Sequence, residues 1–214
     1  MSDWFIDQVN RLGLPVPHVF VETGTYLGIT IAGKADHFRE VHSIDLSEEF
    51  VKNARQKFSQ LNVTIHHGDS AEVLVELSNK LQEPVIFYLD AHYSGGTTAF
   101  GRDEVPLLRE LAVLGNRPYN DIIFVDDTRL FGRSGVEGTP GCKIYPMMHY
   151  DWRDITMEAV FKAYGKPVRA YRAGSYDRMI LVHENAFVEE TLTEVPAAPQ
   201  KAIVPASWSM GHLR

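Results

Sequence analysis

The chain has 214 residues, a length typical of a single domain. With 44% hydrophobic and 23% charged residues, its composition is that of an ordinary globular protein. The net charge of −7 argues against a nucleic-acid partner, because sequence-independent binding to DNA or RNA depends on Lys and Arg. The single cysteine, Cys142, allows no intrachain disulfide, and the first residues lack the pattern of a signal peptide. No apolar stretch approaches the ~20 residues that cross a bilayer, so we expect a cytoplasmic protein with no membrane partner.

Short β-rich runs alternate with stretches of helical periodicity in the first 127 residues. The expected strands cover 18–22, 41–45, 62–67, 84–90 and 121–127, and the expected helices cover about 27–39, 47–60, 70–81 and 103–115. The fourth and fifth runs are apolar almost throughout, which is typical of central strands covered on both faces. The alternation predicts an α/β fold with a Rossmann-like, doubly wound and mostly parallel sheet.

The rest of the chain has a different pattern. Four glycines between residues 128 and 141 predict a long loop, and a helix is expected at about 154–164. The runs 167–174 and 177–184 then predict a terminal antiparallel hairpin, turning at Gly174 and Ser175, which completes a seven-stranded sheet. Because the chain is rich in Ala and Pro from about residue 190, we expect one domain at 1–189 and an extended tail at 190–214.

The first expected strand runs directly into a loop with two glycines. Gly24 can turn tightly and lets the backbone approach a ligand, and Gly28 permits close packing on the strand. Asp45 closes the second strand, where a carboxylate is placed to accept hydrogen bonds from ribose hydroxyls. The carboxyl ends of neighbouring strands meet at one edge of the sheet, so the loop and Asp45 converge on a ligand site. The G-x-x-x-G spacing does not match the motifs that bind pyrophosphate.

A third motif, Gly68-Asp69-Ser70, follows the third expected strand, where Asp69 and Ser70 also fit a plain helix cap. In order, the E-x-G-x-x-x-G loop, Asp45 and this segment resemble the motif series of class I S-adenosylmethionine-dependent methyltransferases, over about residues 18–183. The resemblance implies S-adenosylmethionine as cofactor, with Glu22 and Gly24 facing its methionine end, Asp45 its ribose, and Asp69 with Ser70 its adenine. The predicted donor site consists of Glu22, Thr23, Gly24, Thr25, Tyr26, Gly28, Asp45, Gly68, Asp69, Ser70 and Asp90.

Carboxylates also follow the fourth and fifth expected strands, where Asp90 is followed by His92, and Asp126 by Asp127. Such a set suits a hard divalent cation such as Mg²⁺, which prefers oxygen ligands. Metal binding makes a substrate hydroxyl more acidic, and His92 is suited to remove its proton near neutral pH. The same residues also fit simpler roles, because Asp126 and Asp127 can cap a loop or bind Arg129, and His92 can be a structural histidine.

This second cluster resembles metal-dependent O-methyltransferases that act on sugars and natural products. The resemblance implies Asp90, Asp126 and Asp127 as metal ligands, and Asp90 and His92 as catalytic residues. Catechol-type members carry a lysine shortly after the first Asp, whereas positions 91–94 here are Ala, His, Tyr and Ser, so a catechol acceptor is not expected. The stretch from Asp90 to Gly101 also resembles bacterial methyltransferases of unassigned substrate. Residues 93–96 and 128–150 are expected to wall the acceptor pocket.

We therefore predict transfer of a methyl group to a hydroxyl of a small-molecule or glycan acceptor, with or without Mg²⁺. Three alternatives stay open. They are a metal-independent N-methyltransferase, an aminopropyl transferase whose Asp90, Asp126 and Asp127 bind a polyamine, and a non-catalytic interaction module. A homo-oligomer is compatible with the hairpin and the tail, which offer a sheet edge for pairing.

Overall fold

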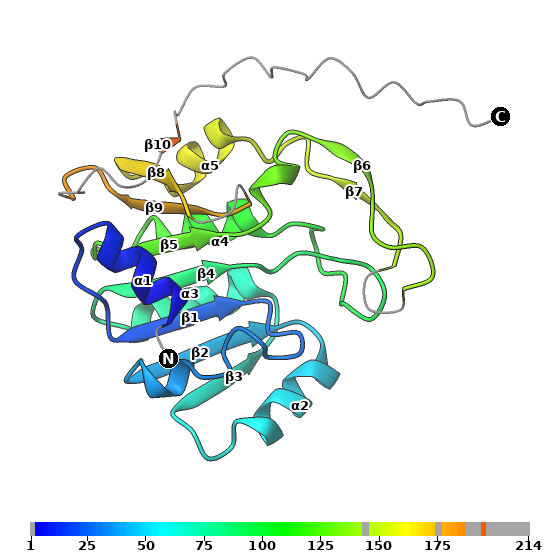
Figure 1. Cartoon of the computed structure of the whole chain (residues 1–214), viewed down its shortest axis with the longest axis horizontal. Coiled ribbons are helices and arrows are strands. Elements are labelled where there is room, and N and C mark those ends of the chain that lie inside the picture. The colour runs from blue at the N-terminus through cyan, green and yellow to red at the C-terminus, as the bar shows by residue number, and fades with distance from the viewer. Residues whose placement is uncertain (1–2, 143–145, 174–176, 187–193, 196–214) are drawn as a thin grey trace.

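The computed structural model describes residues 3–142, 146–173, 177–186 and 194–195, which form a central sheet with helices on both faces (Figure 1). The strand order is β10-β8-β9-β5-β4-β1-β2-β3. Its parallel part consists of β1 (Val19–Thr23), β2 (Glu40–Asp45), β3 (Val63–His67), β4 (Val85–Leu89) and β5 (Ile122–Val125). The order reverses at β1, which lies between β2 and β4, and open α/β sheets bind ligands at such a point.

Two layers of helices enclose the sheet. Helices α3 (Ser70–Lys80), α4 (Leu107–Leu114) and α5 (Met157–Tyr164) pack on one face, and α1 (Trp4–Arg11) and α2 (Glu48–Lys57) pack on the other. Every residue of β1, β4 and β5 is buried, because both faces of these strands are covered. No helix among the described residues combines the length and apolar character needed to cross a membrane.

The predicted α/β fold with its mostly parallel sheet is confirmed. The terminal hairpin is present as β8 (Val168–Arg172) and β9 (Met179–His183), and β9 pairs antiparallel with β5. Its turn at Gly174 and Ser175 lies outside the described residues. The two-residue β10 (Glu194–Val195) pairs with β8 beyond the predicted seven strands and makes the sheet eight-stranded. Apart from β10, the predicted tail at 190–214 lies outside the described residues.

The helix expected at about 27–39 is wrong. These residues form turns and the short 3₁₀ helix η1 (Lys34–Asp36). Gly28 and Gly33 have φ angles of 67° and 85°, which an α-helix cannot contain. The apolar spacing that suggested a helix instead reflects Ile31 and Phe38. Both side chains are buried although neither residue lies in a helix.

Helix α1 is absent from the sequence-based expectations, although it has a recognisable signal. Asp3 caps it, because its Oδ1 accepts hydrogen bonds from the backbone N–H groups of Phe5 and Ile6 at 3.0 and 3.3 Å. Phe5 and Val9, one helical turn apart, are both buried. The cap and the spacing together would have predicted the helix.

The long loop expected at 128–141 is only partly correct. The 3₁₀ helix η2 (Thr128–Leu130) is followed by β6 (Ser134–Glu137), which pairs antiparallel with β7 (Met148–Asp151) in a separate hairpin. In Figure 1 this yellow-green hairpin lies beyond the carboxyl ends of β4 and β5. Glycine in a strand weakens the sequence pattern, and Gly135 sits here where a Cβ would crowd the Tyr150 ring.

The turn after β1 passes against the end of β4. Gly24 has a φ angle of 89°, and its N–H donates to the carbonyl oxygen of Ile44 at 2.8 Å. A Cβ at this position would lie 2.5 Å from the backbone oxygen of Asp90, closer than real Cβ atoms approach. Any side chain at position 24 would therefore force the turn and the end of β4 apart.

Gly24→Ala is expected to destabilise the fold more than Gly33→Ala does. The two glycines have similar φ angles, 89° and 85°, so each substitution carries a similar left-handed strain of ~1–2 kcal/mol. A Cβ at position 33 meets no described atom within 4 Å, whereas one at position 24 meets the Asp90 carbonyl. Urea unfolding of both variants measures the difference. Equal losses would show that the turn and β4 are not in close contact.

A buried histidine pair joins β2 to β3. Nδ1 of His42 lies 3.0 Å from Nε2 of His66, and Nε2 of His42 lies 2.8 Å from Oε1 of Glu40. Burial lowers the pKa of His42. Burial, together with the neighbouring His42 and the charge of Lys80, lowers the pKa of His66 to about 4. The folded pair is therefore neutral at neutral pH.

Stability is expected to fall as the pH drops from about 6.5 to about 4. Over this range the unfolded chain, whose histidines have ordinary pKa values, binds protons that the folded His66 does not bind. His66→Gln should lose less stability over the same range, and His149→Gln, at an exposed position of β7, should follow the unmodified protein. Urea unfolding across this range gives the comparison. Parallel curves for His66→Gln and the unmodified protein would contradict it.

Candidate active site

A pocket of about 510 Å³ lies at the carboxyl edge of the parallel strands. Residues after β1, β2 and β3 form one part of its lining, and residues after β4 and β5 form another. The predicted site residues that line it are Gly24, Tyr26, Asp45, Gly68, Asp69, Ser70, Asp90, His92, Asp126 and Asp127. The structure therefore brings the predicted donor and acceptor clusters into one cavity.

Asp45 ties the turn after β1 to the end of β2. Its Oδ2 accepts a hydrogen bond from the backbone N–H of Tyr26 at 2.8 Å, and its Oδ1 accepts one from Ser47 N–H at 2.8 Å. Tyr26 has a φ angle of 45°, unusual for a residue with a side chain, and its ring packs edge-on against Phe50. Each carboxylate oxygen keeps a second lone pair, so Asp45 can still accept a hydrogen bond from a ligand hydroxyl.

Four residues of the predicted donor site lie behind the pocket surface. Glu22 is buried, and the Ser43 hydroxyl donates to its Oε2 at 2.7 Å; the Ser43 and Thr25 hydroxyls lie 2.7 Å apart. Burial raises the pKa of Glu22 to about 8, so its carboxyl group is mainly protonated at neutral pH. Thr23 is buried beside them, and Gly28 lies against Phe58. These residues support the turn that forms the pocket wall.

Asp69 forms the helix cap that the sequence allows, next to Ser70, the first residue of α3. Asp69 caps α3, because its Oδ1 accepts from the backbone N–H of Ala71 at 3.0 Å. Its Oδ2 accepts from Nη1 of Arg109 at 2.9 Å, and both Asp69 and Ser70 also line the pocket. The helix cap thus holds this wall in place.

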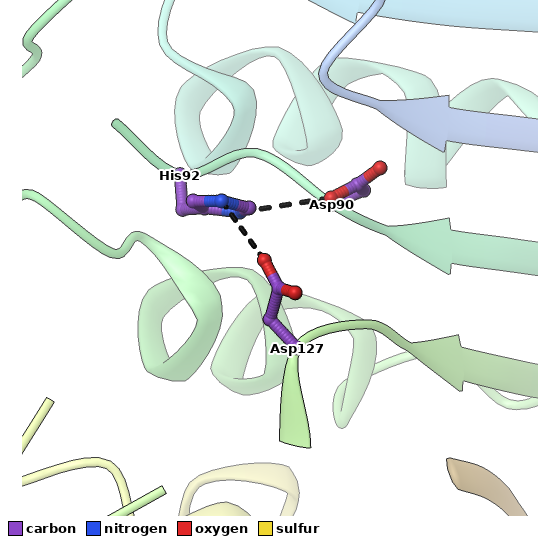
Figure 2. A group of neighbouring side chains, drawn as sticks. All are labelled: Asp90, His92 and Asp127. Atoms are coloured by element: carbon purple, nitrogen blue, oxygen red, sulfur yellow. Dashed lines mark ion pairs between the residues drawn. The ribbon is translucent and has the colours of Figure 1, made fainter. Parts of the chain in front are cut away.

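His92 lies between two carboxylates, as Figure 2 shows. Its Nε2 lies 2.9 Å from Oδ2 of Asp127, which belongs to the segment after β5. Its Nδ1 lies 3.6 Å from Oδ1 of Asp90, beyond hydrogen-bond distance. The hydroxyl of Ser94 lies 2.9 Å from Nε2. Contacts at Nε2 therefore hold the His92 ring, while Nδ1 faces Asp90 without a hydrogen bond to it.

The charges of this group are strongly coupled. Burial raises the pKa of Asp90 to about 7, with the His92 charge opposing and the charges of Asp126 and Asp127 adding to the rise. Burial also acts to raise the pKa of Asp127, but hydrogen bonds and charges from His92 and Arg129 hold it at about 2. For His92, burial is outweighed by Asp127 and the other carboxylates, which raise its pKa above 6.5. Asp127 is therefore the ionised partner of His92.

Asp126 pairs with Arg178, a partner that the sequence does not predict. Arg178 directly precedes β9, and its Nε and Nη2 donate to Oδ1 and Oδ2 of Asp126, both at 3.1 Å. The hydroxyl of Tyr88 also donates to Oδ2. Both oxygens of Asp126 are thus engaged with a guanidinium group, and Asp127 pairs likewise with Arg129. The plain alternative, in which the acidic pair binds Arg129, is correct for Asp127.

The predicted magnesium ligands do not form one free ligand set. Ligand atoms approach within 4.8 Å of one another in Asp90, His92 and Asp127, and in Asp126, Asp127 and Asp177. A cation at either group would compete with the guanidinium of Arg129 for Asp127, and the second group would also compete with Arg178. Divalent cations bind carboxylates that are free to coordinate. The described residues therefore fit the predicted magnesium site poorly.

Glu137 and Tyr150 of the β6–β7 hairpin line the pocket and belong to the expected wall at 128–150. Asp177 and Arg178, from the hairpin that returns beside β5, also line it, and no sequence signal assigns them to the site. The strand count brings β9 next to β5, but no motif marks which of its residues face the pocket. Trp152 is 2% exposed and packs its ring edge-on against His92, with centroids 5.4 Å apart.

No family model and no curated protein matches the chain. Solved structures do match it, and three of them, each at most 15% identical, are the following. DesVI of Streptomyces venezuelae is 15% identical, with a TM-score of 0.52, over 84% of this chain and 89% of that chain. CalS10, an amino pentose methyltransferase of Micromonospora echinaspora, is 11% identical, with a TM-score of 0.52, over 86% and 92%. The sugar N-methyltransferase KedS8 of a Streptoalloteichus species is 14% identical, with a TM-score of 0.53, over 84% and 85%.

These matches cover most of both chains. At such low identity they establish the fold alone. The chain has the class I fold of S-adenosylmethionine-dependent methyltransferases.

Proposed function

We propose that the protein transfers a methyl group from S-adenosylmethionine to a hydroxyl of a small-molecule or carbohydrate acceptor. One observation carries this proposal: Gly24, Asp45 and Asp69 of the donor motifs line the same pocket as the group formed by Asp90, His92 and Asp127. The fold supports it, since known methyltransferases share it. A non-catalytic module would have no need for a half-buried histidine held between two carboxylates beside that motif.

The donor occupies the side of the pocket formed after β1, β2 and β3. Asp45 accepts hydrogen bonds from the ribose hydroxyls, and Gly24 lets the methionine end approach the backbone. The apolar side chains of Ile44, Leu46 and Phe50 also line this side and suit the adenine ring. His92 lines the same pocket and would lie on the acceptor side of a donor bound there.

Bound S-adenosylmethionine supplies an electrophilic methyl group on a sulfonium. The protein orients the two reactants and removes a proton. A bond forms between the acceptor oxygen and the methyl carbon as the sulfur–methyl bond breaks, which leaves S-adenosylhomocysteine. The hydroxyl proton passes to Nδ1 of His92, which faces Asp90, while Asp127 holds Nε2 and stabilises the charged ring.

The reaction is proposed in its metal-independent form. Arg178 and Arg129 already balance the charges of Asp126 and Asp127. A bound magnesium ion would have to displace them or share their carboxylates. The proton acceptor is therefore the His92–Asp127 pair of this chain.

N-methylation is the second candidate. Among the described residues, no cationic side chain lies at hydrogen-bond distance from Asp90, because Nδ1 of His92 is 3.6 Å from its Oδ1. The side chain of Asp90 is 28% exposed. A protonated amine of an acceptor could bind there before it loses a proton. Matched hydroxyl and amine acceptors in one assay separate the two reactions by which product is methylated.

Calorimetric titration is expected to show micromolar binding of S-adenosylmethionine and S-adenosylhomocysteine. Asp45→Ala should weaken binding about tenfold or more, because it removes the ribose acceptor and both hydrogen bonds that hold the turn. Glu49→Ala removes the same charge from an exposed position of α2 and should bind normally. The donor assignment is wrong if neither compound binds the unmodified protein.

His92→Gln is expected to reduce methyl transfer at least 100-fold while leaving donor affinity within about threefold, since a positioned base contributes about 10²–10⁴-fold. His149→Gln serves as the matched control at an exposed position. The measurement is single-turnover transfer from labelled donor to an acceptor found by screening. Full activity in His92→Gln would exclude the proposed base.

The same assay tests the role of metal. Stripping the protein with a chelator should leave the rate unchanged, because no step depends on a cation. A rate that disappears on stripping and returns with Mg²⁺ would instead support the metal-assisted reaction.

A further inference from the structure

Asp90 and His92 also line a small second cavity. Glu110 of α4 and Trp152, next to the end of β7, form other parts of its wall. The cavity measures about 10 Å³, and a site of roughly 10–15 Å³ holds one water molecule. Its size therefore fits a single buried water and excludes a larger ligand.

Two unsatisfied polar atoms belong to residues of this wall. Oε1 of Glu110 and Nε1 of Trp152 are buried and have no hydrogen-bond partner among the described residues. The two residues are 1% and 2% exposed, so bulk solvent does not reach them. Buried polar atoms in proteins almost always bond to protein or to ordered water. One atom is an acceptor and the other a donor, the pair that a bridging water requires.

Two hydrogen bonds hold the backbone of Trp152 in place beside the cavity. The backbone N–H of Trp152 donates to the carbonyl oxygen of Arg133 at 2.7 Å, and the backbone carbonyl oxygen of Trp152 accepts from Gly132 N–H at 3.1 Å. Burial raises the pKa of Glu110 to about 7, and the nearby hydroxyls of Ser70 and Thr23 oppose the rise. Glu110 and Trp152 both line the cavity.

We propose that one water molecule occupies this cavity, accepts a hydrogen bond from Nε1–H of Trp152 and donates one to Oε1 of Glu110. Glu110 is then a positioning residue between the two halves of the pocket. Its carboxyl group lies close to the hydroxyls of Ser70 and Thr23, and through the water it holds the indole that packs edge-on against His92 at 5.4 Å. This link to His92 rests on the proposed function, whereas the water itself does not.

The experiment detects the water directly and needs no activity. In ¹⁵N-labelled protein, the indole N–H signal of Trp152 is assigned by its loss in Trp152→Phe. If that variant does not fold, contacts of the indole with the His92 ring protons assign the signal. We expect a nuclear Overhauser effect from a long-lived water to this N–H in the unmodified protein. A protected indole N–H that shows no effect from water would overturn the proposal.

Two substitutions at position 110 test the role of Glu110. Glu110→Gln keeps a carbonyl oxygen at this position and should preserve the water signal. Glu110→Leu has similar bulk and no acceptor, so the signal should disappear and the indole N–H should shift. An unchanged water signal in Glu110→Leu would show that Glu110 does not hold the water. Because donor titration is a separate measurement, failure here and failure of the methyltransferase proposal are distinguishable.

Discussion

The close contact of Gly24 with the backbone of Asp90 sets the geometry of the pocket. It brings the turn after β1 against the strand end from which Asp90 and His92 emerge. The motif glycine therefore has two roles, because it lets the turn approach a ligand and also fixes the distance between the two sides of the site. Asp45 completes the arrangement by binding the turn from β2.

Burial divides the acidic groups of the site into two kinds. Glu22 and Glu110 lie under the surface, and burial raises their pKa values to about 8 and about 7, so both can stay protonated as neutral hydrogen-bonding groups. Asp126 and Asp127 instead have arginine partners, and Asp127 stays ionised beside His92. Glu22 and Glu110 therefore support the scaffold, whereas the ionised Asp127 and Asp90, whose pKa burial raises to about 7, both line the pocket.

The sequence predicts the position of the site better than its interactions. Apolar runs locate the parallel strands, whose carboxyl ends share one edge, and this is enough to gather Asp45, Asp90 and Asp127. It does not show that Arg178, 52 residues away from Asp126, occupies both oxygens of that carboxylate. Such pairing depends on how side chains from distant segments pack together. The periodicity of the sequence carries no information about that packing.

Local conformation limits the prediction in a similar way. The motif does not show that Glu22, inside β1, is buried behind the pocket surface. The helix expected at 27–39 fails because Gly28 and Gly33 have positive φ angles. The sequence does not predict the β6–β7 hairpin, because the glycines of this segment resemble those of a loop.

The β6–β7 hairpin forms a sheet of its own, yet Glu137, Met148 and Tyr150 from its strands line the pocket. The donor side, in contrast, is made by the strands of the central sheet. Mutations in the hairpin can therefore remodel the proposed acceptor side without disturbing the residues proposed to hold the donor. Descendants of one ancestral chain could share a methyl donor and diverge in the compounds that they modify.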